Sequence, residues 1–424
     1  MMGRRRIENL LLGALSLAHV AVCRVGFARG RRAKSMDDRS PILVIRCEAK
    51  LGDNLLHIPF LRALRSIAPG RPIHLVHHVA ARGIYEDCPY VDERIEVAWR
   101  MSAPATLLHR IGLCAAVFRA ETRRRYDIAL VPRWDEDLYA PFIAWMSGAQ
   151  RIVGFSRRVL AEKAVRNIGT DGLFTDAVRD TSVLHESRRS LQLLERLSGT
   201  PCTASSRLEF WFPDRARSKI ERLQSAVSGA TDWVAIAPGA ALDRRKWPLE
   251  RFRAVAQVLA QRAGLGLLVI GTAAESDACA DVARGLPGLA LDLSGHLDLQ
   301  ETAAALSTCR LFIGNDSGLL HLACAVQTPV LEISCHPEGA PDLHPNSPAR
   351  FGPSVEPSAV MRPSRALAAE CRDGCVHAHA HCITGVATAG VIEAAAALLG
   401  LIASRQDRSR RTESRATASA ASRP

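Results

Sequence analysis

The sequence lacks an apolar run long enough for a confident transmembrane helix. The stretch Leu10–Cys23 has 14 residues, whereas a spanning helix needs ~20. Twelve cysteines in 424 residues are too few for a disulfide-dense miniprotein, and 29 Gly with 22 Pro form no collagen-like repeat. A hydrophobic content of 48% excludes a disordered chain. The length predicts two or three domains, each with its own core.

The body of the chain also lacks net charge. Of the formal charge of +12, residues 1–40 carry +6 and residues 404–424 carry +4, which leaves about +2 for the residues between. A groove for nucleic acid needs a basic patch on the folded body. We therefore expect no nucleic-acid partner.

The basic ends have several interpretations. Leu10–Cys23 follows three arginines, as in a signal peptide, but no Ala-x-Ala cleavage pattern follows it. An interfacial helix on an anionic membrane surface and a flexible leader are the alternatives. The Ser/Arg/Ala-rich tail, residues 404–424, suits the same membrane surface or a solvated disordered segment.

Nine of the cysteines are scattered, several within apolar runs, which is typical of buried reduced thiols in a reducing compartment. The other three, Cys371, Cys375 and Cys382, form a C-x3-C-x6-C cluster with histidines between them. Three ligands without a clear fourth are a weak zinc signature. We expect a structural turn here, and no metal.

Short β-branched strands alternate with helical stretches through the first half of the body. Ile42–Arg46 is followed by a Gly turn and a helix over Leu55–Ile67, then by strands at Ile73–Val76, Tyr126–Val131 and Arg151–Phe155. This alternation predicts an α/β domain, residues 41–210, with a doubly wound parallel sheet.

The same pattern restarts after a boundary near residues 200–215. Strands are expected at Val234–Ala237, Leu267–Gly271, Leu289–Leu293 and Leu311–Gly314, with helices between them and a closing helix over Val386–Ser404. Residues 211–403 therefore form a second doubly wound domain. We expect the active site in a cleft between the carboxyl ends of the two sets of strands.

Asp53 lies in the Gly turn after the first strand, where Gly52 allows close backbone approach. Its carboxylate could act as a general base, or it could cap the following helix, since Asp is favoured at N-caps. Lys50 and His57 lie nearby as candidates for the acceptor side, although a helix-face position explains His57 more simply.

Two later turns have features of anion sites. Gly239 lies in a small-residue turn after a buried strand, and the cations Arg244, Arg245 and Lys246 follow it. Backbone amides and basic side chains in such a place could bind a phosphate or diphosphate. A solvated basic loop is the alternative.

The second turn, Asp316-Ser317-Gly318, ends a buried strand and opens a helix that carries His321. Ser317 and the Gly318 amide form a second anion cradle, and Asp316 could bond a ribose hydroxyl. The alternative is an ordinary turn with its own N-cap.

Together, these stretches resemble glycosyltransferase family 9, the bacterial heptosyltransferase family. The matching segments are Ile42–Leu64, Ala237–Phe252 and Phe312–Val330, with a weaker match at Cys371–Ile383. The resemblance implies a GT-B fold with two Rossmann-like domains. It also implies inverting, metal-independent transfer of a sugar, typically from ADP-heptose as a substrate, with no cofactor.

The resemblance also implies site residues and partners. Asp53 matches the catalytic base, Lys246 matches a residue at the donor phosphates, and Asp316, Ser317, Gly318 and His321 match the donor-nucleotide element. The implied acceptor is a lipid-linked glycan of the lipopolysaccharide core. The implied location is the cytoplasm, peripheral on the inner face of the inner membrane, which agrees with the basic, apolar leader over residues 1–40.

Two departures separate this chain from the family pattern. The first loop reads Cys47-Glu48-Ala49-Lys50 instead of small polar residues, and Glu332 stands in a strand that is commonly apolar. Acceptor and donor-sugar preference could differ accordingly. The alternatives to a transferase are a non-catalytic GT-B scaffold and an enzyme like a nucleotide-sugar epimerase.

Overall fold

The computed structural model describes residues 39–98, 126–137, 139–262, 264–286 and 289–400. The chain divides into two compact units between Ser206 and Arg207, and each unit is described by itself. The predicted tail and nearly all of the predicted leader lie outside the described residues. Among the described residues, no helix is both long enough and apolar enough to cross a bilayer.

The N-terminal unit is built on a six-stranded parallel sheet with the order β3-β2-β1-β4-β5-β6. Its strands are β1 Ile42–Arg46, β2 Ile73–His78, β3 Glu93–Val97, β4 Ile128–Val131, β5 Arg151–Phe155 and β6 Asp176–Val178. Strand β3 was not expected from the sequence, because its charged residues alternate with apolar ones at the sheet edge.

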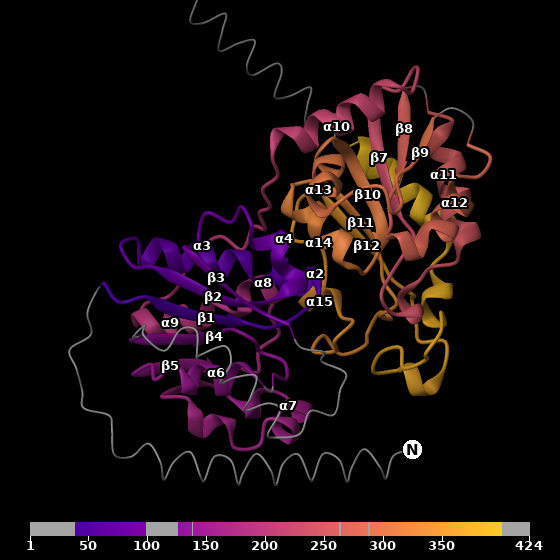
Figure 1. Cartoon of the computed structure of the whole chain (residues 1–424). Helices are drawn as coiled ribbons and strands as arrows, with labels where there is room; N and C mark the ends of the chain where they lie inside the picture. The colour runs from indigo at the N-terminus through magenta and orange to yellow at the C-terminus, as the bar shows by residue number, and fades with distance from the viewer. Residues whose placement is uncertain (1–38, 99–125, 138, 263, 287–288, 401–424) are drawn as a thin grey trace, which may run out of the picture. The chain divides into compact units, whose positions relative to one another are not determined.

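Helices lie on opposite sides of this sheet, as Figure 1 shows for α3 and α6. The helices of the unit are α2 Leu51–Leu55, α3 Ile58–Ile67, α4 Arg82–Tyr85, α6 Ala140–Met146, α7 Ala161–Arg166, α8 Glu186–Arg189 and α9 Leu191–Ser198. Leu43 and Ile45 of β1 pack into the same core cluster as Ile143 of α6. Every residue of β1 is buried, as a parallel strand covered on both faces requires.

The C-terminal unit repeats the architecture with the order β12-β11-β10-β7-β8-β9. Its strands are β7 Asp232–Ala237, β8 Leu265–Val269, β9 Ala290–Asp292, β10 Cys309–Asn315, β11 Val330–Ile333 and β12 Ser358–Met361, all paired in parallel. These strands form the orange half of Figure 1.

The helices of this unit are α10 Asp214–Ser225, α11 Leu249–Ala260, α12 Ser276–Ala283, α13 Leu299–Ser307, α14 Gly318–Ala325 and α15 Pro348–Phe351. A further helix covers 388–400, within the predicted closing helix. Asp298 begins α13 with a capping box, in which its side chain accepts a hydrogen bond from Glu301 N at 2.8 Å. The predicted α/β class with two doubly wound sheets is confirmed.

Trp247 anchors the loop after β7 to the core of the C-terminal unit. Its side chain is fully buried and packs edge-to-face on Phe252 of α11, with ring centroids 5.1 Å apart. Its indole N–H donates to the Val386 carbonyl at 3.1 Å, and Arg251 Nη1 donates to the same oxygen at 2.7 Å. The loop that contains Arg245 and Lys246 is thereby held to the segment that precedes the closing helix.

We expect Trp247→Ala to destabilise the C-terminal unit by about 3–5 kcal/mol, because it empties a large buried site. Trp247→Phe is the matched control. It keeps an aromatic ring against Phe252 and removes one hydrogen bond to the Val386 carbonyl, which still accepts a hydrogen bond from Arg251. The free energy of unfolding should therefore fall by only about 1 kcal/mol. Urea unfolding followed by circular dichroism compares the two, and equal losses would contradict the packing role.

Candidate active site

Both sheets reverse their strand order at the centre, between β1 and β4 in the first unit and between β7 and β10 in the second. Open parallel sheets bind ligands beyond the carboxyl ends of the strands at such a switch point. The sequence-predicted residues follow three of these four strands. Asp53 comes after β1, Gly239 after β7, and Asp316 after β10.

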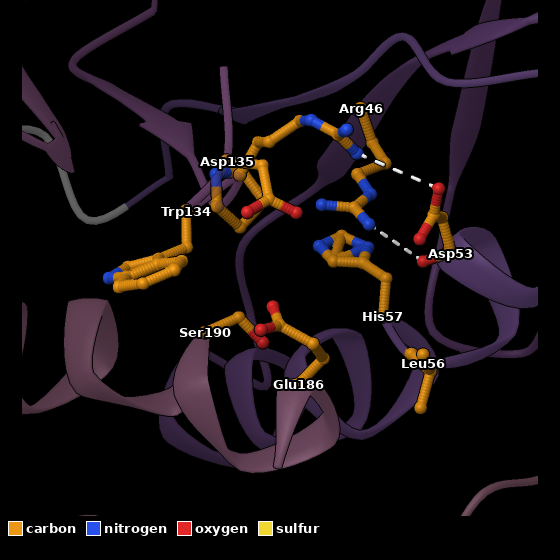
Figure 2. A pocket seen from close by; sticks show the side chains of 10 residues that line it. Arg46, Asp53, Leu56, His57, Trp134, Asp135, Glu186 and Ser190 are labelled. Atoms are coloured by element: carbon orange, nitrogen blue, oxygen red, sulfur yellow. Dashed lines mark hydrogen bonds and ion pairs between the residues drawn. The ribbon is translucent and has the colours of Figure 1, made fainter. Parts of the chain in front are cut away.

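In the N-terminal unit a pocket opens at the switch point (Figure 2). Its lining comes from the β1 and β4 ends, from α2 with the start of α3, and from α8 with the residue after it: Arg46, Asp53, Leu56, His57, Pro132, Arg133, Trp134, Asp135, Glu186 and Ser190. Figure 2 shows Glu186 and Ser190 on the side of the pocket opposite Arg46 and Asp135. The predicted base and the predicted acceptor-side residue His57 therefore share one pocket.

Charges in this pocket are paired with one another. The buried Glu48 carboxylate lies between two guanidinium groups, 2.9 Å from Arg46 Nε and 2.7 Å from Arg133 Nη1. Burial opposes the charge on Arg133, but Glu48 and then Asp53 outweigh it, and the pKa of Arg133 is raised. Lys163 holds this loop in place by donating to the carbonyls of Arg133 and Trp134 at 3.0 and 2.9 Å.

Asp53 lies at the edge of this charge cluster. Its Oδ2 is 3.8 Å from Arg133 Nη1, and its carbonyl accepts a hydrogen bond from Arg46 Nη2 at 2.7 Å. The alternative role of Asp53 as a helix N-cap is wrong, because Lys50 occupies the N-cap of α2 and Asp53 lies in the first turn. The side chain of Lys50 is exposed and does not line the pocket.

His57 is neutral in this environment. Burial first, and the charge of Arg46 second, hold the pKa of His57 well below its ordinary value of 6.5. Its ring stacks on Phe60 at 4.9 Å between centroids, and neither ring nitrogen has a hydrogen-bond partner among the described residues. A neutral imidazole here can accept or donate a hydrogen bond to a ligand in the pocket.

In the C-terminal unit, Asn315 at the end of β10 ties the two central strands together. Its side-chain nitrogen donates to the Pro238 carbonyl at 2.7 Å, and its side-chain oxygen accepts from Trp247 N at 3.1 Å. We call residues 238–247, which begin and end at these two contacts, the donor loop. Gly239 in this loop lies against the Glu275 carboxylate, and a Cβ there would force that side chain to move.

Arg245 and Lys246, two basic residues of the donor loop, have different partners and different exposure. Arg245 Nη1 lies 2.9 Å from the Asp316 carboxylate, and its other nitrogens donate to Asn346 Oδ1 and the Pro345 carbonyl. Lys246 is 44% exposed, and its Nζ pairs with Asp243 at 2.8 Å. Arg245 is therefore the residue that the structure brings to Asp316.

The second cradle forms where α14 begins. Ser317 is the N-cap residue of this helix, yet its hydroxyl makes no capping bond and has no partner among the described residues. Gly318 is the first residue of α14, and the first amides of a helix have no partner within it. His321 is buried in the same helix. A free hydroxyl and a helix N-terminus of this kind can bind an anion, and they lie beside the Arg245–Asp316 pair.

Glu332, the unexpected residue of β11, lies next to this cradle. It pairs in register with Gly314 of β10, two residues before Asp316, and it is 1% exposed. Burial first, and the negative charge of Asp316 second, raise the pKa of Glu332 well above its ordinary value. The raised pKa favours the protonated form of the Glu332 carboxyl, which can donate a hydrogen bond.

Two doubly wound parallel sheets, each with a central switch point, are the architecture of the GT-B fold, which the solved relatives share. The family model for glycosyltransferase family 9 (heptosyltransferase) matches residues 115–334. The chain belongs to this family and is a glycosyltransferase.

A curated relative is lipopolysaccharide heptosyltransferase 3 of Escherichia coli strain K12, which is 23% identical over 286 residues and is matched over 66% of this chain and 79% of its own length. A family 9 glycosyltransferase from Veillonella parvula has the same fold with a TM-score of 0.68 at 22% identity, covering 87% of this chain and 99% of that one. The E. coli ADP-heptose lipopolysaccharide heptosyltransferase II superposes with a TM-score of 0.62 at 19% identity, covering 85% and 98%.

Sequence reasoning missed several residues of these sites. Arg133 follows β4 directly, and its position after a predicted strand could have indicated it, because β4 neighbours β1. Glu275 is the N-cap residue of α12 and lies beside Gly239. It follows β8, a third strand of the same sheet. Glu186 lies on the short helix α8, far along the chain, and no local motif marks it.

The raised pKa of Glu332 predicts a pH dependence of stability. A carboxyl that titrates higher in the folded state contributes stability that is complete below its ordinary pKa of 4.5 and is lost as pH rises through the folded value. The glutamine side chain of Glu332→Gln cannot ionise, so we expect the stability of this variant relative to the wild type to increase as the pH rises above 4.5.

Thermal unfolding midpoints of both proteins across this range give the measurement. Glu338→Gln changes an exposed glutamate in the following loop and should show a pH-independent difference from the wild type. A Glu332→Gln difference that stays flat with pH would mean that Glu332 is ionised in the folded protein.

Proposed function

We propose that the protein transfers a heptose, with inversion, from ADP-heptose to a lipopolysaccharide core or related glycan acceptor. Family membership and the names of the relatives support the reaction class. The observation that carries the proposal is the cradle at the end of β10, where Arg245 pairs with Asp316 beside the unpartnered Ser317 hydroxyl and the N-terminus of α14. Such a cradle suits the diphosphate of a nucleotide-sugar donor.

In the proposed reaction, Asp53 removes the proton from the acceptor hydroxyl. The acceptor oxygen attacks the anomeric carbon on the face opposite the diphosphate, the bond from that carbon to the diphosphate oxygen breaks, and the configuration inverts. Arg133, 3.8 Å from the carboxylate, orients Asp53 within the pocket. One base is sufficient for a single displacement.

The leaving diphosphate gains negative charge as its bond to the sugar breaks. Arg245, Lys246 and the amides that begin α14 would stabilise that charge through fixed donors. Gly239 keeps the donor loop close to Glu275. In this scheme Asp316 and protonated Glu332 form hydrogen bonds with hydroxyl groups of the donor. The positive charges that assist the transfer step come from side chains of the protein itself.

The acceptor in this proposal is lipid-linked, so the enzyme acts at the inner face of the inner membrane. The basic, apolar leader predicted over residues 1–40 supports this location, because arginines attract anionic lipids. The location and the lipid-linked partner both belong to the proposal.

We expect Asp53→Asn to lower kcat by about 10²–10⁴, because it removes the general base while keeping the shape of the side chain. Binding of ADP should stay unchanged, since the donor site lies on other residues. Asp87→Asn, at an exposed position of the same unit, is the matched control and should keep full activity. Coupled detection of ADP release and calorimetry give the two readouts, and an Asp53→Asn variant that retains substantial turnover would remove the base assignment.

We expect Arg245→Ala to weaken ADP binding by about 10- to 100-fold, since a charge-assisted hydrogen bond contributes about 1.5–3 kcal/mol. Lys246→Ala should weaken it less, because Lys246 is exposed and paired with Asp243. Calorimetry with ADP, GDP, UDP and CDP compares both variants with the wild type. A larger effect of Lys246→Ala would reverse these roles, and a folded wild type that binds no nucleotide would favour the non-catalytic scaffold.

A further inference from the structure

Three thiols and one imidazole converge in the segment that precedes the closing helix. Cys371 ends the turn η6 (Ala369–Cys371), Cys375 follows in the next turn, and His381 directly precedes Cys382, which begins the turn η7 (Cys382–Gly385). Their four ligand atoms all lie within 4.8 Å of one another. The three cysteines are almost completely buried, at 0%, 2% and 0% exposure.

The distances within this cluster match those of a tetrahedral metal site. His381 Nδ1 lies 3.7 Å from Cys371 Sγ and 3.4 Å from Cys382 Sγ. A tetrahedral zinc ion with bonds of about 2.3 Å to sulfur and about 2.0–2.1 Å to nitrogen holds such ligand atoms about 3.5–3.8 Å apart. These two distances already match such a site, and the remaining pairs, at no more than 4.8 Å, would have to shorten by about 1 Å at most.

Cys279 and Cys335 pack in the same apolar core cluster as these three cysteines, which is the usual place of a reduced cysteine. Among the described residues, only Cys371, Cys375 and Cys382 gather with a ring nitrogen within ligand distance. The sequence alone showed three ligands, and the fold supplies the fourth by placing His381 against the sulfurs.

We propose that Cys371, Cys375, His381 and Cys382 bind one zinc ion in a closed, structural Cys3His site. All four ligands come from 12 consecutive residues, Cys371–Cys382, and a spacing of three residues between the first two cysteines is typical of such sites. The set leaves no open position for a substrate, which separates this ion from the transfer step. This proposal departs from the sequence-based expectation of a turn without metal.

The cluster connects to the donor loop through its last residues. Thr384 donates from both N and Oγ1 to the His381 carbonyl, at 2.9 and 2.7 Å. Arg251 Nη1 in turn donates to the Thr384 carbonyl at 2.7 Å, and the Trp247 indole donates to Val386. Metal binding would therefore stabilise the end of the donor loop, and this consequence alone rests on the proposed function.

The test uses the full chain, purified in reductant without chelator, and measures metal by mass spectrometry. We expect about one zinc ion per chain in the wild type. Cys279→Ser, which changes a buried thiol outside the cluster, is the matched control and should keep the ion. Cys375→Ser and His381→Ala should each lower the zinc content at least about tenfold after dialysis, since ligand loss breaks the closed site.

A second measurement covers variants that fail to fold. Cobalt(II) added to the reduced, metal-free wild type should give the charge-transfer and visible bands of tetrahedral thiolate coordination, and zinc should bleach them. A wild type that contains no metal and takes up neither ion would overturn the proposal. So would a disulfide among the three cysteines found by peptide mapping, or zinc that both variants retain.

Iron bound through the same residues would overturn the choice of zinc. Binding of ADP distinguishes failure of the metal site from failure of the proposed transferase function. A chain that binds zinc through the cluster but no nucleotide keeps the metal site and loses the transferase assignment. A chain that binds ADP but no metal keeps the transferase assignment and loses the metal site.

Discussion

The amide side chain of Asn315 joins the two strands at which the C-terminal sheet reverses its order. It donates to the turn after β7 and accepts from Trp247 N, so both ends of the donor loop depend on one buried residue. Trp247 then contacts Val386, which follows the Cys/His cluster. The donor loop, the α14 cradle and the cluster therefore form a continuous set of contacts within one unit. Loss of any one of them would loosen the loop that presents Arg245.

The main constraint on the N-terminal unit is that its buried charges are paired with charges of opposite sign. Glu48 lies between Arg46 and Arg133, and removal of either partner would leave an ion unbalanced in a buried site. This arrangement also explains why His57 is neutral, since it is buried beside Arg46. Asp53 adjoins the cluster and remains partly accessible, which suits a group that exchanges a proton with an incoming hydroxyl. The departure at Glu48 from the family pattern thus has a structural role.

Strand-turn-helix alternation was sufficient to predict two doubly wound parallel sheets, because short β-branched runs and Gly turns are local signals. It also placed Asp53, Gly239 and Asp316 at the carboxyl ends of strands. Edge strand β3 was missed, since its charged residues alternate with apolar ones. The order of the strands could not be read either, because pairing joins segments far apart in the chain. Arg133 became part of the first pocket only through that order.

The sequence by itself determined the fold class, the family resemblance and the turns that carry Asp53 and Asp316, since each depends on residues close together along the chain. Only the tertiary structure decided which cation of the donor loop meets Asp316, because Arg245 and Lys246 are adjacent and differ only in direction. It also decided that Glu332 is buried near Asp316, which raises its pKa, and that His381 lies against three cysteine sulfurs. Burial, charge and ligand distance are properties of neighbours in space, which local sequence does not encode.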